Sequence, residues 1–94
     1  MKIVSVIPAF NEEETIVRVV CETKRYVDHV IVVDDGSADE TFVEAQEAGA
    51  LVLAHRKNRG KGEALRTGFK RALELGADVI VTLDADAQHD PNEI

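Results

Sequence analysis

The sequence is poor in aromatic residues and in cysteine. Its 94 residues include no tryptophan, one tyrosine and three phenylalanines, so the core must be built mainly from Val, Ile, Leu and Ala. The single cysteine, Cys21, cannot form an internal disulfide. Because Cys21 lies among apolar residues with helical spacing, we expect a buried structural thiol in a protein of a reducing compartment.

Long apolar runs are also absent. No stretch approaches the roughly 20 apolar residues that cross a bilayer, and none has the pattern of an amphipathic membrane helix. The glutamates at positions 12–14 follow the first apolar run, where a signal peptide would carry small residues and a cleavage site. We therefore expect a cytoplasmic protein.

Positive charge is scarce as well. The 11 Lys and Arg are outnumbered by 18 Asp and Glu, which gives a formal net charge of −7 and argues against a nucleic-acid partner. A chain of this length has room for one small domain, and we expect a single domain over residues 1–94. The hydrophobic fraction of 45% excludes a disordered chain.

Four short runs rich in β-branched residues predict strands, at residues 2–7, 29–34, 50–55 and 78–83. They are nearly continuous in apolar residues, which is typical of strands covered on both faces in a parallel sheet. Between them, three segments have helical periodicity. Alternating strands and helices with right-handed crossovers predict an α/β fold, a Rossmann-like three-layer α/β/α arrangement with a parallel four-stranded sheet in the order 3-2-1-4.

Each predicted helix has a recognisable start. The first is expected to begin at Asn11 as the N-cap, with the glutamates in its first turn, and the second at Ser37, which forms a capping box with Glu40. The third covers residues 61–75. We expect its buried face to be Ala64, Leu65, Gly68, Phe69, Ala72 and Leu73. Residues 91–94 resemble the first turn of a further helix, so we expect the sequence to stop within a larger fold.

Acidic residues follow the predicted strands, at the edge where open parallel sheets bind ligands. Crowded carboxylates repel one another unless a cation compensates them. Asp84 and Asp86, with the amide oxygen of Gln88, therefore form a candidate site for Mg²⁺ or Mn²⁺. The alternative is that Asp84 or Asp86 only caps the turn after the strand.

The pair Asp34 and Asp35 ends the second strand. Because successive side chains of a strand point to opposite faces, one should be directed into the sheet and the other into the cleft, which makes Asp35 a candidate acceptor for a base or ribose. The basic segment 55–62 could hold a diphosphate through backbone amides and Lys61, or could be only a solvated loop. We assign no catalytic role to His55 or His89.

Taken together, four motifs resemble the nucleotide-binding half of family 2 glycosyltransferases of the GT-A fold, and most closely the dolichyl-phosphate and polyprenyl-phosphate mannose synthases. They occur in the family's order and cover the chain from end to end. These motifs are Pro8-Ala9-Phe10-Asn11-Glu12, Val33-Asp34-Asp35-Gly36-Ser37, Asn58-Arg59-Gly60-Lys61-Gly62 and Asp84-Ala85-Asp86-Ala87-Gln88-His89. Phe10 replaces a tyrosine found in many relatives.

The resemblance implies a nucleotide-diphospho-sugar donor, GDP-mannose or a UDP-hexose, a divalent cation, Mg²⁺ or Mn²⁺, and inverting transfer to a polyprenyl phosphate or another acceptor. The cation would be held by Asp84, Asp86 and Gln88. With Lys61 added from the basic segment, the expected donor-site residues are Pro8, Ala9, Phe10, Glu12, Val33, Asp35, Lys61, Asp84, Ala85 and Asp86. A lipid acceptor would place the protein at the cytoplasmic face of a membrane.

Catalytic domains of the family are more than twice as long, so we expect a truncated front half that lacks the general base and the acceptor surface. The alternative function is a catalytically incomplete nucleotide- or metal-binding module with a regulatory or assembly role. In either case the fourth strand would be a bare edge without Lys or Pro, and we therefore expect a homo-oligomer.

Overall fold

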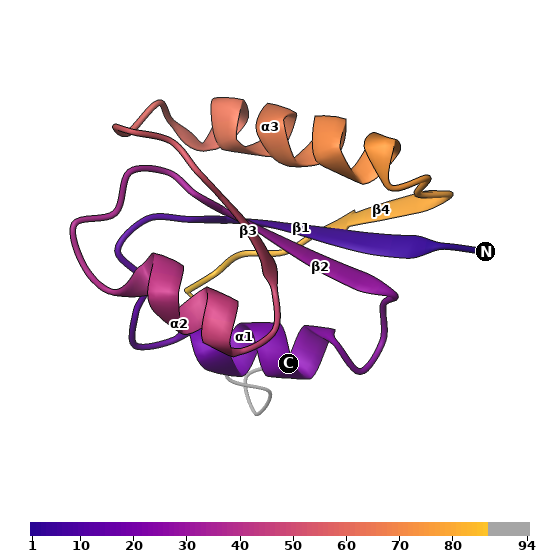
Figure 1. Cartoon of the computed structure of the whole chain (residues 1–94), viewed down its shortest axis with the longest axis horizontal. Helices are drawn as coiled ribbons and strands as arrows, with labels where there is room; N and C mark the ends of the chain where they lie inside the picture. Colours follow the sequence, from indigo (N-terminus) through magenta and orange to yellow (C-terminus); the bar gives the residue numbers. More distant parts are fainter. Residues whose placement is uncertain (87–94) are drawn as a thin grey trace, which may run out of the picture.

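The structure is a computed structural model and describes residues 1–86 (Figure 1). Strands and helices alternate along the chain, as the sequence predicts. The strands are β1 (Ile3–Ala9), β2 (His29–Asp34), β3 (Leu51–Ala54) and β4 (Val79–Thr82). The helices are α1 (Ile16–Thr23), α2 (Thr41–Glu47) and α3 (Lys61–Glu74). Every strand lies within one residue of its predicted start and within two of its predicted end.

The four strands form one parallel sheet in the order β3-β2-β1-β4, which confirms the predicted topology. Helix α3 covers one face of the sheet, and α1 and α2 cover the other (Figure 1). Strand β1 lies in the middle and pairs with both β2 and β4. The carboxyl ends of β1, β2 and β4 therefore open onto one end of the molecule, and the site must be sought there.

Alternation along β1 supplies both halves of the core. Val4 and Val6 pack under α3 with Ala64 and Ala72, while Ile7 faces α1. Small residues on α3 let the helix lie close to the sheet. A Cβ atom on Gly68 would lie 2.2 Å from Cγ1 of Val6, so no larger residue fits at this crossing without a shift of the core.

The predicted starts of the first two helices are wrong. Helix α1 begins five residues after Asn11, and α2 begins at Thr41 with no capping hydrogen bond from a side chain at its N-cap. Asn11 has a left-handed backbone with φ of 53°, a conformation that Asn tolerates better than most residues. Asn11 and Ser37 bond to each other's loops instead, because the two loops lie side by side after neighbouring strands.

Three side chains expected in the core are exposed. The thiol of Cys21 is free and exposed on α1, so the expectation of a buried thiol is wrong. On α3, Phe69 is 37% exposed and Leu73 is 66% exposed, although the sequence assigned both to the buried face. Within the described residues the sheet is four strands wide, and the small residues Ala64, Gly68 and Ala72 suffice to contact it. Within residues 1–86, no helix has the length and apolar character needed to span a bilayer.

Candidate functional site

A cleft of about 350 Å³ opens at the carboxyl ends of the strands. It brings together segments that follow β1, β2, β3 and β4. Its lining residues are Pro8, Ala9, Phe10, Glu12, Asp35, Asn58, Gly60, Lys61, Ala64, Asp84, Ala85 and Asp86. All the donor-site residues expected from the sequence line this cleft except Val33. The side chain of Val33 is fully buried in the core beneath α3, because its position in β2 faces the helix.

The loops after β1 and β2 form one wall, and hydrogen bonds join them in both directions. The amide of Asn11 donates to Oγ of Ser37 at 2.8 Å, and the amide of Ala38 donates to Oδ1 of Asn11 at 2.8 Å. The amide of Glu12 donates to Oγ1 of Thr41, which is fully buried. This wall fixes the backbone on either side of Phe10 and Glu12, two of the residues that line the cleft.

Asp35 joins the loop after β2 to the loop after β3. It is 3% exposed, and its carboxylate accepts the amides of Arg59 at 2.9 Å and Gly60 at 2.8 Å and a ring nitrogen of His55 at 2.7 Å. Burial raises the pKa of Asp35, but the hydrogen bonds from His55, Arg59 and Gly60 outweigh this effect and hold the pKa below its usual value. Asp34 is buried too, but it accepts the amide of Ser37 and does not line the cleft.

His55 is a residue that sequence reasoning left without a role. Its Nδ1 lies 2.7 Å from Oδ1 of Asp35, and its Nε2 lies 2.8 Å from Oγ1 of Thr67 on α3. Its side chain is 8% exposed. The ring therefore links the cleft to the middle of α3. The only signal in the sequence is the position of His55 directly after a strand, which many surface histidines share.

Gly36 allows the second and third loops to touch. Its φ is +78°, and a Cβ atom there would lie 2.5 Å from the amide nitrogen of Asn58 and 2.6 Å from the carbonyl carbon of Lys57. Both atoms belong to the backbone and cannot rotate away. A glycine at this position is therefore required for the segment 57–60 to reach Asp35.

The segment after β4 supplies the acidic rim. Asp84 accepts a hydrogen bond from Nζ of Lys61 at 2.9 Å, and this bond and the charge of Asp84 raise the pKa of Lys61. Burial, and then the charge of Asp86, raises the pKa of Glu12. The carbonyl oxygen of Ala85 accepts the hydroxyl of Thr15 at 2.7 Å, which ties the rim to the start of α1.

The structure describes only part of the expected metal site. Asp84 and Asp86 both line the cleft, whereas Gln88 lies outside the described residues, as does His89. Residues 1–86 contain no group of three or more His, Cys, Asp or Glu side chains arranged to hold a metal ion. Two carboxylates at a cleft still suit Mg²⁺, which proteins often bind through one or two carboxylates, with phosphates and water completing the shell. The charge that Asp86 exerts on Glu12 is one that a cation would relieve.

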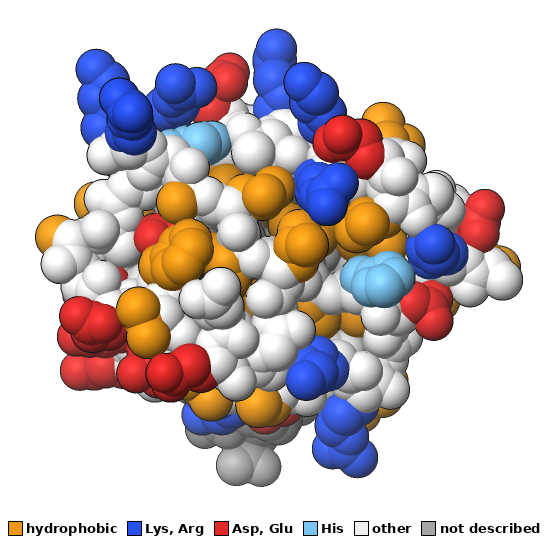
Figure 2. Space-filling view, viewed as in Figure 1, with side chains coloured by type: hydrophobic (Ala, Val, Ile, Leu, Met, Phe, Trp, Pro, Cys, Tyr) orange, Lys and Arg blue, Asp and Glu red, His pale blue; other side chains and the backbone are white. Residues whose placement is uncertain are grey.

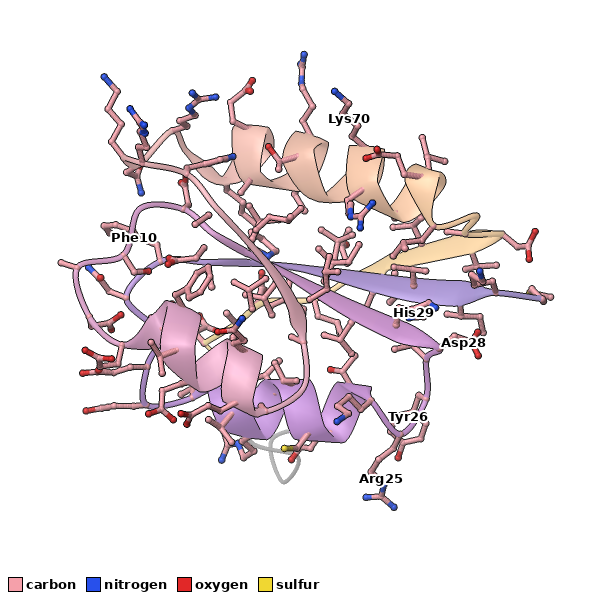
Figure 3. The ribbon with its side chains drawn as sticks, in the orientation of Figure 1. Phe10, Arg25, Tyr26, Asp28, His29 and Lys70 are labelled. Atoms are coloured by element: carbon pink, nitrogen blue, oxygen red, sulfur yellow. The ribbon has the colours of Figure 1, made fainter. Side chains whose placement is uncertain are left out.

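Phe10 is the large apolar side chain of the cleft. It is 46% exposed and lies at the end of the sheet opposite to Asp28 and His29 (Figure 3). An exposed aromatic face beside a hydrogen-bond acceptor such as Asp35 is an arrangement that can receive a nucleobase, which stacks on one group and donates to the other.

Sequence comparison finds relatives along nearly the whole chain. The model of the family "Glycosyl transferase family 2" matches residues 5–94. A UDP-N-acetylglucosamine–dolichyl-phosphate N-acetylglucosaminyltransferase of Methanococcus voltae is 40% identical, over 95% of this chain and 43% of the relative. An undecaprenyl-phosphate 4-deoxy-4-formamido-L-arabinose transferase of Salmonella choleraesuis is 35% identical, over 99% of this chain and 31% of the relative.

Solved structures give the same result. A glucosyl-3-phosphoglycerate synthase from Mycobacterium tuberculosis, in complex with Mn²⁺, UDP-glucose and phosphoglyceric acid, matches with a TM-score of 0.74 and 34% identity. The match covers 89% of this chain and 33% of the synthase. The chain thus spans between about a third and two fifths of the length of these relatives. The match over residues 5–94 and the shared fold lead to one conclusion: the chain belongs to glycosyl transferase family 2.

Proposed function

We propose that the chain binds a nucleotide-diphospho-sugar in the cleft, together with Mg²⁺ or Mn²⁺, as the donor half of a glycosyltransferase that uses a polyprenyl phosphate acceptor. The main support is the convergence of the expected donor-site residues on one cleft at the carboxyl ends of the strands. The activities for which the relatives are named support the two substrates: a UDP-linked sugar in one relative, and dolichyl or undecaprenyl phosphate in two.

In this proposal the base and ribose lie in the part of the cleft between Phe10 and Asp35. Phe10 stacks on the base, and Pro8 lines the same cleft. Within the described residues, Oδ2 of Asp35 accepts one hydrogen bond, from the amide of Gly60, whereas Oδ1 accepts two. A carboxylate oxygen can accept two, so Oδ2 has capacity for an N–H of the base.

The diphosphate lies toward Lys61 and the acidic rim. The ammonium of Lys61 and the carboxylate of Asp84 form an exposed pair, and Lys61 can turn from Asp84 to a phosphate oxygen. Asp84 and Asp86, with Gln88 as a further ligand, would hold the cation, which supplies neutralising charge to the departing nucleoside diphosphate. Without that charge, the carboxylates of Glu12, Asp84 and Asp86 would repel the phosphates.

Among donors, we favour a UDP-sugar over GDP-mannose. The relative at 40% identity carries UDP in its name, and the structural neighbour holds UDP-glucose. We assign no general base to any residue of the chain.

Calorimetric titration with UDP-glucose, UDP-N-acetylglucosamine and GDP-mannose, each with and without Mn²⁺, tests the proposal. We expect binding of the UDP-sugars that strengthens with Mn²⁺ and weakens about tenfold or more in Asp86→Asn. The matched control is Asp78→Asn, which removes an exposed carboxylate at the opposite end of β4. Equal titration of Asp86→Asn and wild type in Mn²⁺ would show that Asp86 is only a turn residue. Donor binding without sugar transfer to a polyprenyl phosphate would favour the non-catalytic alternative.

A further inference from the structure

The positive charge of the chain is concentrated in one part of the fold. Seven of the 11 Lys and Arg lie within residues 56–74, together with two of the 18 Asp and Glu. This segment is the loop after β3 and helix α3. Lys and Arg side chains gather along the edge of the molecule that these two elements form, whereas Asp and Glu gather near the start of α2 (Figure 2). The chain is therefore strongly polarised, with a basic face on an acidic protein.

The same face carries two large apolar side chains. Arg66, Phe69, Lys70 and Leu73 follow one another at the i, i+3, i+4, i+7 spacing of a single helix face, and all four are exposed. Leu73 is 66% exposed, the most of any large apolar side chain on the described helices. Lys70 points away from the sheet (Figure 3). The sheet-facing side of α3 is made instead by Ala64, Gly68 and Ala72.

We propose that the outer face of α3, with the loop 56–59, binds the surface of a lipid bilayer that contains anionic phospholipids. The sequence alone predicts no amphipathic membrane helix because it places Phe69 and Leu73 in the core, but both side chains are exposed. Cations interleaved with exposed Phe and Leu are the composition of helices that lie in a membrane interface, where the apolar side chains enter the lipid and the cations meet the headgroups. A soluble polyanion such as a nucleic acid would satisfy the cations but would offer no apolar interior to the side chains of Phe69 and Leu73.

The loop 56–59 connects this face to the cleft. Arg56, Lys57 and Arg59 are exposed, while Asn58 from the same loop lines the cleft, followed by Gly60. A bilayer on the basic face would therefore lie beside the mouth of the cleft. If the proposed function is correct, this position brings a lipid-linked phosphate acceptor close to the bound donor. Bilayer binding itself needs neither donor nor acceptor, so it can be tested separately.

Co-sedimentation with vesicles is the first test. The 94-residue chain should bind vesicles of phosphatidylcholine with 30% phosphatidylglycerol, added as the probe, and should not bind pure phosphatidylcholine. Binding should fall as salt is raised, because the attraction between exposed charges is screened. Arg66→Ser with Lys70→Ser should weaken binding by about 30-fold, since each cation near an anionic surface contributes roughly a factor of five. The matched control, Arg18→Ser with Arg25→Ser, removes the same charge from the α1 side and should bind nearly as wild type does.

A tryptophan reporter tests the apolar contact. Because the chain has no tryptophan, Phe69→Trp and Leu73→Trp each place a single indole on the proposed face. Their emission should shift to shorter wavelength on anionic vesicles. Val43→Trp is the matched control, at an exposed position of α2 on the other side of the sheet, and its emission should not change.

Three results would overturn the proposal: equal binding to neutral and anionic vesicles, equal loss in the two double variants, or no shift in the Phe69→Trp and Leu73→Trp spectra. Binding of soluble heparin without binding of anionic vesicles would also overturn it and would assign the face to a soluble polyanion. Far-ultraviolet circular dichroism confirms that each variant is folded. Failure of the donor titrations would leave these vesicle results unaffected, so the two proposals fail independently.

Discussion

Replacing Asp35 by Asn should destabilise the chain much more than the same change at Asp34. An amide has one acceptor oxygen, so the substituted side chain could keep His55 and Arg59 as donors only by turning its NH₂ group toward the amide of Gly60. The two remaining hydrogen bonds would lose their charge, at a cost of about 1 kcal/mol each, and the unsatisfied amide would cost about 1–3 kcal/mol. The expected total is about 3–5 kcal/mol.

Asp34→Asn is the matched control because it changes a neighbouring buried carboxylate. Its oxygen accepts the amide of Ser37 at 3.0 Å, and the carbonyl of an asparagine can accept the same bond. The expected loss is therefore about 1 kcal/mol. Urea unfolding followed by circular dichroism measures both values, since the chain has no tryptophan to report by fluorescence. Equal losses for the two variants would refute the assignment of Asp35 as the acceptor that organises the loop 55–60.

The pH dependence of stability is a second test of the role of the Asp35 carboxylate. Because the pKa of Asp35 is lowered in the folded chain, its contribution to stability is present above the unfolded value of about 3.9 and is lost as the pH falls through the folded pKa. The difference in free energy of unfolding between wild type and Asp35→Asn should therefore stay constant down to about pH 5 and shrink as the pH falls through and below the unfolded pKa of about 3.9. A difference that grows on acidification would contradict this reasoning.

Further predictions concern packing and assembly. Gly68→Ala should lower the free energy of unfolding by about 1–3 kcal/mol, because the added Cβ overlaps a core valine. Gly62→Ala on the same helix has open space around the added Cβ and should raise the free energy of unfolding by about 0.5–1 kcal/mol. Urea unfolding should therefore give changes of opposite sign for the two variants. Gly36→Ala should displace the backbone at 57–58 and weaken nucleotide binding in calorimetry. We also expect dimers or larger oligomers in light scattering, with Val81→Lys shifting them toward monomer, because Val81 is 37% exposed on the edge strand β4; a monomer at high micromolar concentration would contradict this.

The order of the elements and the sheet topology could be predicted because continuous Val and Ile runs and helical spacing are local signals, and because crossover handedness restricts how they assemble. The starts of the first two helices could not. Asn11 and Ser37 are good N-caps in isolation, but each found a partner in a loop distant in sequence. Such partners depend on which strands are neighbours in the sheet. The periodicity of the sequence does not predict the hydrogen-bond partner of a single side chain.

The candidate site divides in the same way. Residues that follow strands, such as Asp35 and Asp86, could be identified because parallel strands end at one edge. Val33 was assigned to the cleft by motif, but its register in β2 places it under α3. The role of His55 depends on its contacts with Asp35 and Thr67. These partners lie 20 and 12 residues away from it in the sequence, so no local pattern reveals them. The exposure of Phe69 and Leu73 depends on the width of the sheet, and the spacing of apolar residues in a helix does not predict that width.

The reciprocal bonds between the loops after β1 and β2 restrict how this site can be redesigned. Asn11 supports the backbone at Ala38, and Ser37 supports the backbone at Asn11, so neither loop keeps its shape when the other is replaced. A loop transplanted alone from a relative with a different donor would meet a partner of the wrong length or polarity. Residues 10–15 and 36–41 should therefore be exchanged together, as one cassette, in any attempt to change the nucleotide that the cleft accepts.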